Sequence, residues 1–242
     1  MASEPLRGRG ILVTRPGERA AGLARRIEAA GGRAIVFPAI EIEDLPPPAA
    51  LGELARFDLA VFVSPTAVAK VMAHIQTWPR GLRAATVGGG TRRELEQRGV
   101  TNVVSPAHGA DSESLLAMPE LSDIDGKRVV VFRGEGGREL LGETLRARGA
   151  RVEYAACYRR TPPKARPTWA EREVHAVTVS SSQSLANLRD ALGIAFLRGR
   201  PLFVPHPRVA DAARALSLDE VVLAGPSDDQ MVDALVAYFR HD

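Results

Sequence analysis

An internal duplication is the feature that most constrains the fold of this 242-residue chain. Residues 127–163 repeat the beginning of the chain at a shift of 118 positions, which brings Arg133 onto Arg15 and Gly149 onto Gly31. Each copy contains a short β-branched apolar run, an arginine in a glycine-bearing turn, apolar residues at helical spacing, a glycine and a second apolar run. This order predicts a strand, a helix and a second strand in each copy, with the glycine ending the helix.

The duplication extends over most of the chain. Residues 61–64 (VFVS) align with residues 177–180 (VTVS), and residues 83–91 (RAATVGGGT) align with residues 200–208 (RPLFVPHPR). A repeat of this length is a domain, since solenoid repeats are roughly 20 to 50 residues long. Strands that alternate with helices predict parallel sheets covered on both faces. We therefore expect an α/β fold made of two doubly wound parallel-sheet domains of related topology.

The middle of the chain shows this pattern in detail. It predicts strands over residues 59–63, 84–87 and 102–104, and helices over residues 49–55, 66–75, 91–98 and 112–117. Thr91 and Glu94 have the spacing of a capping box that begins a helix, and Asp111 and Asp228 are each expected to begin a last helix. The Pro-rich stretches at residues 38–48 and 155–167 interrupt the repeats and are the best linker candidates.

Composition excludes several classes of protein. No apolar stretch approaches the ~20 residues that span a membrane, and the first residues (MASEPLRGRG) lack the apolar core of a signal peptide. The single cysteine, Cys157, excludes an internal disulfide and suits a reducing compartment. The net charge of +3 comes from basic residues spread along the chain, which disfavours nucleic-acid binding. We expect a cytoplasmic protein that binds neither membrane nor nucleic acid.

The turns between strands and helices are the candidate binding positions. In such sheets, ligands bind at the carboxyl ends of the strands, where helix amino termini present free N–H groups. The predicted turns carry residue types that suit a polyanion, although the same types also serve simply as helix caps. The candidate binding residues are Arg15, Ser64, Pro65, Thr66, Gly88, Thr91, Arg133, Gly134, Arg138, Ser180, Ser181, Ser182, His206 and Arg208.

Familiar catalytic signatures are missing from the sequence. The turn at residues 134–139 (GEGGRE) has Glu139 in place of the third glycine of a dinucleotide fingerprint, and no lysine follows a Gly-rich loop. The histidines show no metal-ligand spacing with one another or with Cys157, so we expect no metal or redox cofactor. Tyr158 and His206 are suited to acid–base work. The alternatives are that Tyr158 packs a hinge and that His206 caps a helix or contacts a ligand.

An ordered set of motifs resembles the uroporphyrinogen-III synthase family. The motifs are VTRP (13–16), FVSPTAV (62–68), VGGGT (87–91), DSESLL (111–116), FRGEGGRELL (132–141), CYRRTPP (157–163), VSSSQSLANL (179–188) and HPRVADAA (206–213). The resemblance implies a lyase of tetrapyrrole and haem biosynthesis that cyclises hydroxymethylbilane to uroporphyrinogen III, with inversion of ring D and loss of water. It implies no cofactor or metal, and a catalytic role for Tyr158 at the leaving hydroxyl of the substrate.

The same resemblance implies two domains joined by a two-stranded linker, with the chain crossing twice. Residues 1–37 and 161–242 form one domain, residues 42–157 form the other, and residues 38–41 and 158–160 are the linkers. The resemblance also implies a monomer and leaves open a transient contact with the preceding pathway enzyme. Two other classes stay open from the residues alone: a non-enzymatic two-lobed ligand-binding or sensor module, and a dinucleotide-dependent enzyme, which the broken glycine pattern disfavours.

Overall fold

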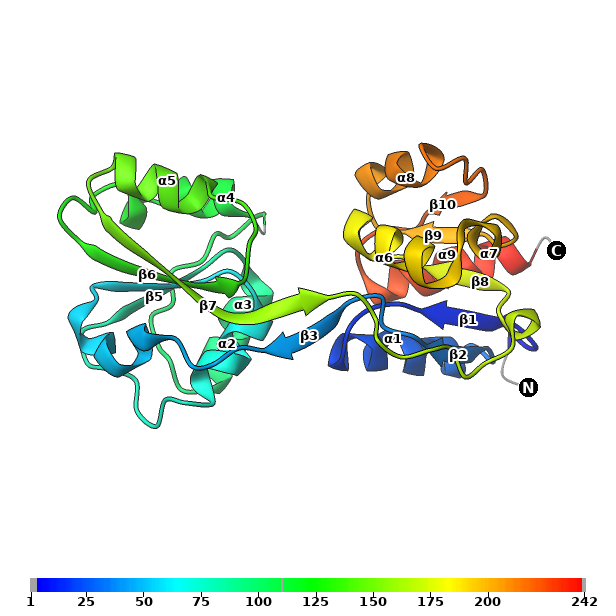
Figure 1. Ribbon diagram of the computed structural model, residues 1–242, viewed down its shortest axis with the longest axis horizontal. Helices are drawn as coiled ribbons and strands as arrows, with labels where there is room; N and C mark the ends of the chain where they lie inside the picture. The colour runs from blue at the N-terminus through cyan, green and yellow to red at the C-terminus, as the bar shows by residue number, and fades with distance from the viewer. Residues whose placement is uncertain (1–3, 110, 241–242) are drawn as a thin grey trace. The chain divides into compact units, whose positions relative to one another are not determined.

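The chain forms two compact units, each built on its own sheet (Figure 1). The computed structural model describes residues 4–109 and 111–240. One unit combines the chain up to Ile42 with the chain from Thr161 onward, and the other is the continuous stretch Glu43–Arg160. Among the described residues, no helix combines the length and apolar character needed to cross a membrane.

The first unit has a parallel five-stranded sheet in the order β10-β9-β8-β1-β2. Leu12 faces one core, shared with α6, α7 and α8, whereas Ile11 and Val13 face a second core, shared with α1 and α9. Helices therefore cover both faces of this sheet. The elements are β1 (Gly10–Val13), α1 (Glu18–Ala29), β2 (Arg33–Val36), η3 (Glu171–Glu173), β8 (Ala176–Thr178), α6 (Ser182–Leu192), α7 (Ile194–Arg198), β9 (Leu202–Val204), α8 (Pro207–Arg214), β10 (Val221–Leu223) and α9 (Asp228–Phe239).

The second unit has a sheet in the order β3-β7-β6-β4-β5, in which β7, β6, β4 and β5 run parallel. Val61 and Val131 pack against α4 and α5, while the next residues, Phe62 and Phe132, stack at 5.0 Å on the opposite face. The elements are β3 (Glu41–Asp44), η1 (Ala49–Arg56), β4 (Leu59–Phe62), α2 (Pro65–Met72), β5 (Arg83–Thr86), α3 (Gly89–Gln97), α4 (Ser112–Leu116), η2 (Pro119–Leu121), β6 (Arg128–Gly134), α5 (Leu140–Ala147) and β7 (Arg151–Thr161).

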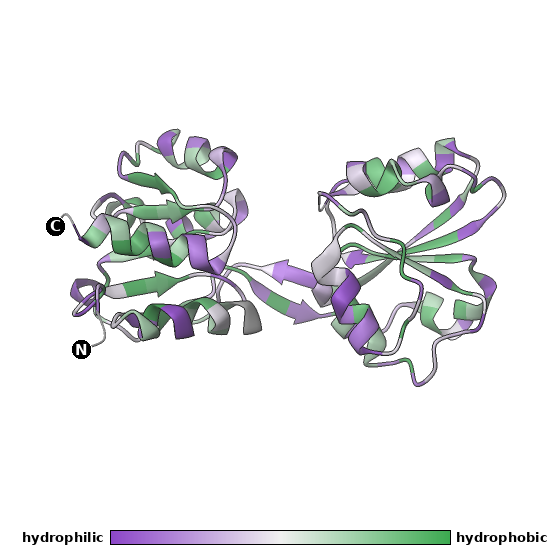
Figure 2. Ribbon diagram, turned by 180° about the vertical axis from the view of Figure 1, so that it is seen from behind, coloured by the Kyte–Doolittle hydropathy of each residue, from purple (hydrophilic) through white to green (hydrophobic). Residues whose placement is uncertain are grey.

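The predicted fold class is confirmed in both units. Figure 2 shows apolar residues concentrated on the strands, with polar residues on the outward sides of the helices. Gly31 and Gly149, the matching glycines of the duplication, have φ values of +85° and +87° and follow α1 and α5. A left-handed residue at this position ends a helix, which explains why both copies keep glycine there.

The predicted start of α3 is wrong. The helix begins at Gly89 with Gly88 as its N-cap and no side-chain cap, so Thr91 lies buried within the first turn. In the turn after β5, the Thr86 hydroxyl donates to the carbonyl of Gly88 at 3.3 Å. Glu94 pairs with Arg98 at 3.0 Å instead of forming a capping box.

Other local predictions also need correction. Residues 102–104 contribute only an isolated bridge between Ala85 and Val104, and residues 49–56 wind as a 3-10 helix rather than an α-helix. Asp111 caps α4 as predicted, but the cap of α9 is Ser227, with Asp228 as the first helical residue.

Candidate functional site

The phenol of Tyr158 lies buried at the carboxyl edge of the second unit's sheet. Tyr158 is 1% exposed, and the pairing of β7 with β6 places it beside Gly134. Its hydroxyl lies 3.1 Å from Ser64 Oγ and 3.2 Å from Arg160 Nη2. A Cβ at position 134 would lie 2.7 Å from the Tyr158 ring, so this crossing requires glycine. Two predicted site residues that stand 94 positions apart are thus in direct contact.

Ser64 is the N-cap of α2. Its Oγ accepts a hydrogen bond from the amide of Ala67 at 3.1 Å, and Pro65 follows at the first helical position, which suits its fixed φ. Thr66 is the second helical residue, so its amide has no acceptor within the helix. The sequence motif therefore folds into a helix terminus that offers N–H groups beside the Tyr158 hydroxyl.

The glycines after β5 form a second helix terminus on the same edge. Gly88 is the N-cap of α3, and the amides of Gly89 and Gly90 lack acceptors within the helix. Both residues are exposed, and a Cβ at either would meet nothing within 4 Å. Thr91 is buried and 4% exposed, which leaves the backbone as the accessible part of this turn.

The guanidinium of Arg133 is turned into its own loop. It donates to Glu139 Oε1 at 3.1 Å and to the carbonyl of Gly136, and it lies 4.6 Å from the ring centre of Tyr154. The Tyr154 hydroxyl accepts from the amide of Gly142 at 3.0 Å and donates to the carbonyl of Glu139 at 3.1 Å. Arg133 and Tyr154 together hold the loop 134–139 against the start of α5. We call these two side chains the Arg133–Tyr154 latch.

Exposed ion pairs surround this latch. Arg138 pairs with Glu113 at 2.5 Å, and Arg159 pairs with Glu135 at 2.5 Å. The Arg159 guanidinium lowers the pKa of the Glu135 carboxyl, chiefly through their hydrogen bond. Exposed pairs of this kind contribute little to stability, so Arg138 can exchange its partner for an anionic ligand.

In the first unit, Arg15, which the duplication aligns with Arg133, also forms an ion pair. Arg15 pairs with Asp228 at the start of α9, and its side chain is 16% exposed. Arg26 pairs with Asp229 at 2.7 Å and with Asp228 at 3.7 Å, which ties α1 to α9. The duplication thus preserves a structural arginine at the carboxyl ends of β1 and β6.

The serines after β8 repeat the arrangement of Ser64. Ser181 caps α6 by accepting from the amide of Ser184 at 3.1 Å, and Ser182 is the first helical residue. Ser180 Oγ lies 3.1 Å from the Ser184 hydroxyl. In this unit no tyrosine hydroxyl is found at the cap among the hydrogen bonds of the described residues.

The turn after β9 presents two exposed basic residues. His206 is the N-cap of α8 but makes no side-chain capping bond, and Arg208 is exposed at the second helical position. Within the described part of the chain, Arg208 forms no ion pair. Both side chains are therefore accessible to a ligand at this edge.

A family model described as "Uroporphyrinogen-III synthase HemD" matches residues 21–233. The chain belongs to the uroporphyrinogen-III synthase family. The uroporphyrinogen-III synthase of Salmonella typhimurium is 36% identical over 244 residues, which cover 93% of this chain and 98% of that relative.

Two solved uroporphyrinogen III synthases share the fold. A mutant of the Thermus thermophilus protein aligns with a TM-score of 0.63 and 19% identity, covering 97% of this chain and 99% of its own. The Helicobacter pylori protein aligns with a TM-score of 0.65 and 12% identity, covering 95% of this chain and 99% of its own. At these identities the likeness shows the fold alone.

Three residues at these edges were missed by the sequence reasoning: Tyr154, Arg160 and Asp228. Arg160 carried a readable signal, because residues two apart in a strand lie on one face, and Arg160 follows Tyr158 by two positions. Asp228 is 213 positions from its partner Arg15, and no local pattern connects them.

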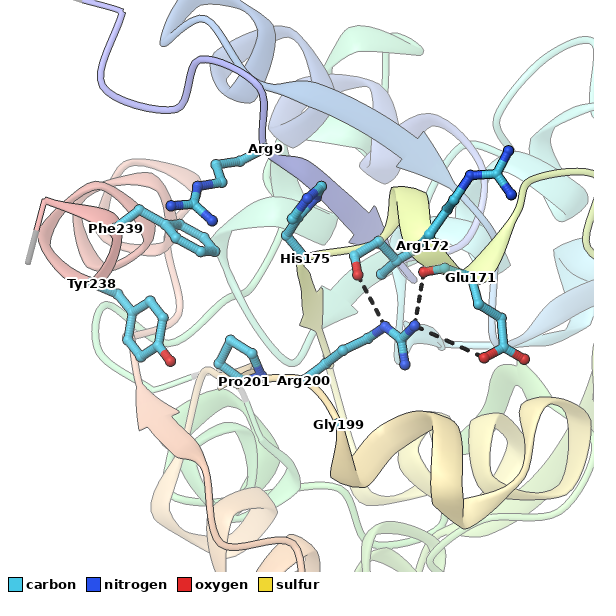
Figure 3. Close-up of a pocket in the computed structure, with 10 residues that line it drawn as sticks. Arg9, Glu171, Arg172, His175, Gly199, Arg200, Pro201, Tyr238 and Phe239 are labelled. Carbon is cyan, nitrogen blue, oxygen red and sulfur yellow. Dashed lines mark hydrogen bonds and ion pairs between the residues drawn. The ribbon is translucent and has the colours of Figure 1, made fainter. Parts of the chain in front are cut away.

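A separate recess of about 270 Å³ lies at the amino ends of the first unit's strands, away from the predicted turns (Figure 3). Arg200 dominates it, but its guanidinium donates to the carbonyls of Glu171, Val174 and Phe196 at 2.7 to 3.0 Å. Burial lowers the pKa of Arg200. Its N–H groups tie η3 to α7, so the recess is better explained as structural than as a ligand site.

Within residues 4–109 and 111–240, no group of three or more His, Cys, Asp or Glu side chains is placed to hold a metal ion.

Proposed function

We propose that this chain is a lyase that closes hydroxymethylbilane into uroporphyrinogen III, with inversion of ring D and loss of water. The observation that carries the proposal is the 36% identity to the Salmonella typhimurium uroporphyrinogen-III synthase over 93% of the chain. The helix termini at the carboxyl ends of both parallel sheets support it, because a linear tetrapyrrole is a polycarboxylate and such termini bind anions.

We assign substrate binding to two groups of donors. The amides of the exposed Gly89 and Gly90 and the exposed side chains of His206 and Arg208 suit the carboxylates of the substrate. Arg15 and Arg133 act indirectly, since their guanidinium groups already pair with Asp228 and Glu139. Ser180, Ser181 and Ser182 would bind through the first turn of α6.

The chemistry needs orientation more than reactive groups. Loss of the terminal hydroxyl as water yields an azafulvene. The substituted carbon of the last ring attacks the electrophilic exocyclic carbon of the azafulvene, and the resulting spiro intermediate rearranges and closes the macrocycle. Holding the two ends in an attacking geometry supplies most of the rate enhancement. We propose that the Tyr158 hydroxyl is the source of the proton with which the hydroxyl leaves as water.

The experiment generates hydroxymethylbilane in place, adds the protein, oxidises the products and separates the porphyrin isomers. We expect the type III isomer as the main product. If the type I isomer of spontaneous closure is the sole product, the chain is not a cyclising lyase, and a two-lobed sensor module becomes the better account.

We further propose a cytoplasmic location, which the buried, unpaired Cys157 suits, and a monomer of 25.9 kDa. The proposed folding domains are residues 1–37 with 161–242, and residues 42–157. Light scattering tests the mass. Limited proteolysis tests the domain limits, since cuts within residues 42–157 that precede cuts near residues 38–41 would contradict them.

A further inference from the structure

The hydroxyl of Tyr158 connects an exposed cation to a helix cap within the second unit. Arg160, two residues further along β7, is exposed, and its guanidinium lies 3.2 Å from the hydroxyl and 5.7 Å from the ring centre. Ser64 Oγ lies 3.1 Å from the same hydroxyl. The three side chains form a continuous hydrogen-bonded row.

The direction of these hydrogen bonds follows from the chemistry of each group. A guanidinium can only donate, so the Tyr158 oxygen accepts from Arg160. Tyr158 is 1% exposed, so the acceptor available for its own proton is Ser64 Oγ. Ser64 already accepts from the Ala67 amide, and a hydroxyl has two acceptor positions and one proton. The hydroxyl proton of Ser64 is then left to be donated to a group outside this row of side chains.

The charge on Arg160 is not neutralised within the unit. Its neighbours at this edge are paired: Arg133 with Glu139, and Arg159 with Glu135. Among the described residues, Arg160 forms no ion pair, and its one hydrogen bond goes to Tyr158. The guanidinium of Arg160 therefore lies beside the Tyr158 hydroxyl without a carboxylate partner of its own.

We infer that Ser64 is the residue that donates the proton to the leaving hydroxyl, that Tyr158 replaces the proton on Ser64, and that Arg160 positions the Tyr158 hydroxyl. The inference rests on the proposed function and assigns its proton path. Tyr158 is too buried to reach the substrate directly, whereas Ser64 is partly exposed.

The step balances as follows. The C–O bond of the terminal hydroxymethyl group breaks, and its oxygen leaves as water with the proton from Ser64. Ser64 takes the proton of Tyr158, and the phenolate stays beside the Arg160 guanidinium. The proton that the substrate releases on ring closure returns to the phenolate.

The test is a double-mutant cycle on the full chain with hydroxymethylbilane as substrate, measuring kcat, KM and the isomer ratio. Tyr158→Phe should lower kcat by about 10²-fold or more. Arg160→Gln should lower kcat about tenfold alone and should have no further effect in the Tyr158→Phe background. Arg160→Lys keeps the charge and should recover part of the rate, with KM unchanged throughout.

Ser64 is tested by two substitutions that separate the proton path from the helix cap. Ser64→Ala should lower kcat to the level of Tyr158→Phe, while Ser64→Thr keeps both hydroxyl and cap and should keep most activity. Ser227→Ala removes a comparable cap, with a 3.1 Å bond to the Gln230 amide, and controls for lost helix stability. Arg159→Gln controls for loss of one exposed charge on β7.

The outcomes separate the two proposals. Wild-type protein that makes only the type I isomer overturns the proposed function and this inference together. If the wild-type protein makes the type III isomer, but the losses of kcat from Arg160→Gln and Tyr158→Phe multiply in the double variant, the inference alone is overturned. Full activity of Ser64→Ala also overturns it, because the proton would then reach the substrate without Ser64.

Discussion

Replacing Tyr154 by Phe removes one hydroxyl and leaves the rest of the Arg133–Tyr154 latch in place. That hydroxyl accepts from the amide of Gly142 and donates to the carbonyl of Glu139, at 3.0 and 3.1 Å. The aromatic ring under Arg133 is kept. The substitution therefore isolates the contribution of the two hydrogen bonds at the start of α5.

The expected loss follows from the burial of each partner. Gly142 is buried, so its amide would lose its acceptor without gaining water, which costs about 1–3 kcal/mol. Glu139 is exposed, so water can replace the hydroxyl at its carbonyl at little cost. We expect Tyr154→Phe to lower the free energy of unfolding by about 1–3 kcal/mol.

The loss of stability in Tyr154→Phe should depend on pH. Burial, and then the neighbouring Glu139, raise the pKa of Tyr154 in the folded protein. The stabilisation from a neutral Tyr154 is fully present below the unfolded pKa of about 10 and is lost as pH rises through the folded pKa. Wild type and Tyr154→Phe should therefore converge in stability above about pH 10.

Urea unfolding at pH 7 and at pH 10.5, followed by circular dichroism, measures both effects. Tyr238→Phe is the matched control, because its hydroxyl donates to Glu220 at an exposed site and its loss should cost less than about 0.5 kcal/mol. The role assigned to the buried hydroxyl would be refuted if both variants lost the same free energy of unfolding. It would also be refuted if the loss in Tyr154→Phe were the same at both pH values.

Three further predictions concern other parts of the molecule. Burial raises the pKa of Cys157 from 9.0 to about 11, so alkylation by iodoacetamide at pH 8 should be about 100-fold slower in the folded than in the urea-unfolded protein, and comparable rates would contradict this. Asp228→Asn leaves Arg15 without its partner and should cost about 1–3 kcal/mol in urea unfolding, whereas an unchanged midpoint would mean that the pair contributes nothing. Gly10→Ala places a Cβ 1.9 Å from the Glu173 carbonyl and should destabilise by about 1–3 kcal/mol, unlike Gly52→Ala, where the Cβ meets nothing within 4 Å; equal thermal midpoints would argue against the clash.

Patterns set by near neighbours in the chain were readable from the sequence. The apolar runs and helical spacings predicted both α/β units, and the duplication predicted matching left-handed glycines at positions 31 and 149. Asp111 was read correctly as the start of α4. Such features depend on residues a few positions apart, and their energies act within one turn or one strand.

The errors have local causes as well. Thr91 looked like an N-cap because a Glu follows three residues later, but the three preceding glycines let the helix start earlier at Gly89. Residues 102–104 have the composition of a strand, yet they form one bridge at the sheet edge. Strand formation depends on pairing with a neighbour, which the composition of the segment does not specify.

What the sequence by itself determined is the repeated strand–helix pattern and the set of turns that face the carboxyl edges. What only the tertiary structure decided is how the charged and polar side chains of those turns are used. Arg15 is held by an aspartate 213 positions away, and Tyr158 meets Ser64 across 94 positions. Backbone patterns follow from local periodicity, whereas the partner of a polar side chain depends on which segments the fold brings within about 3 Å.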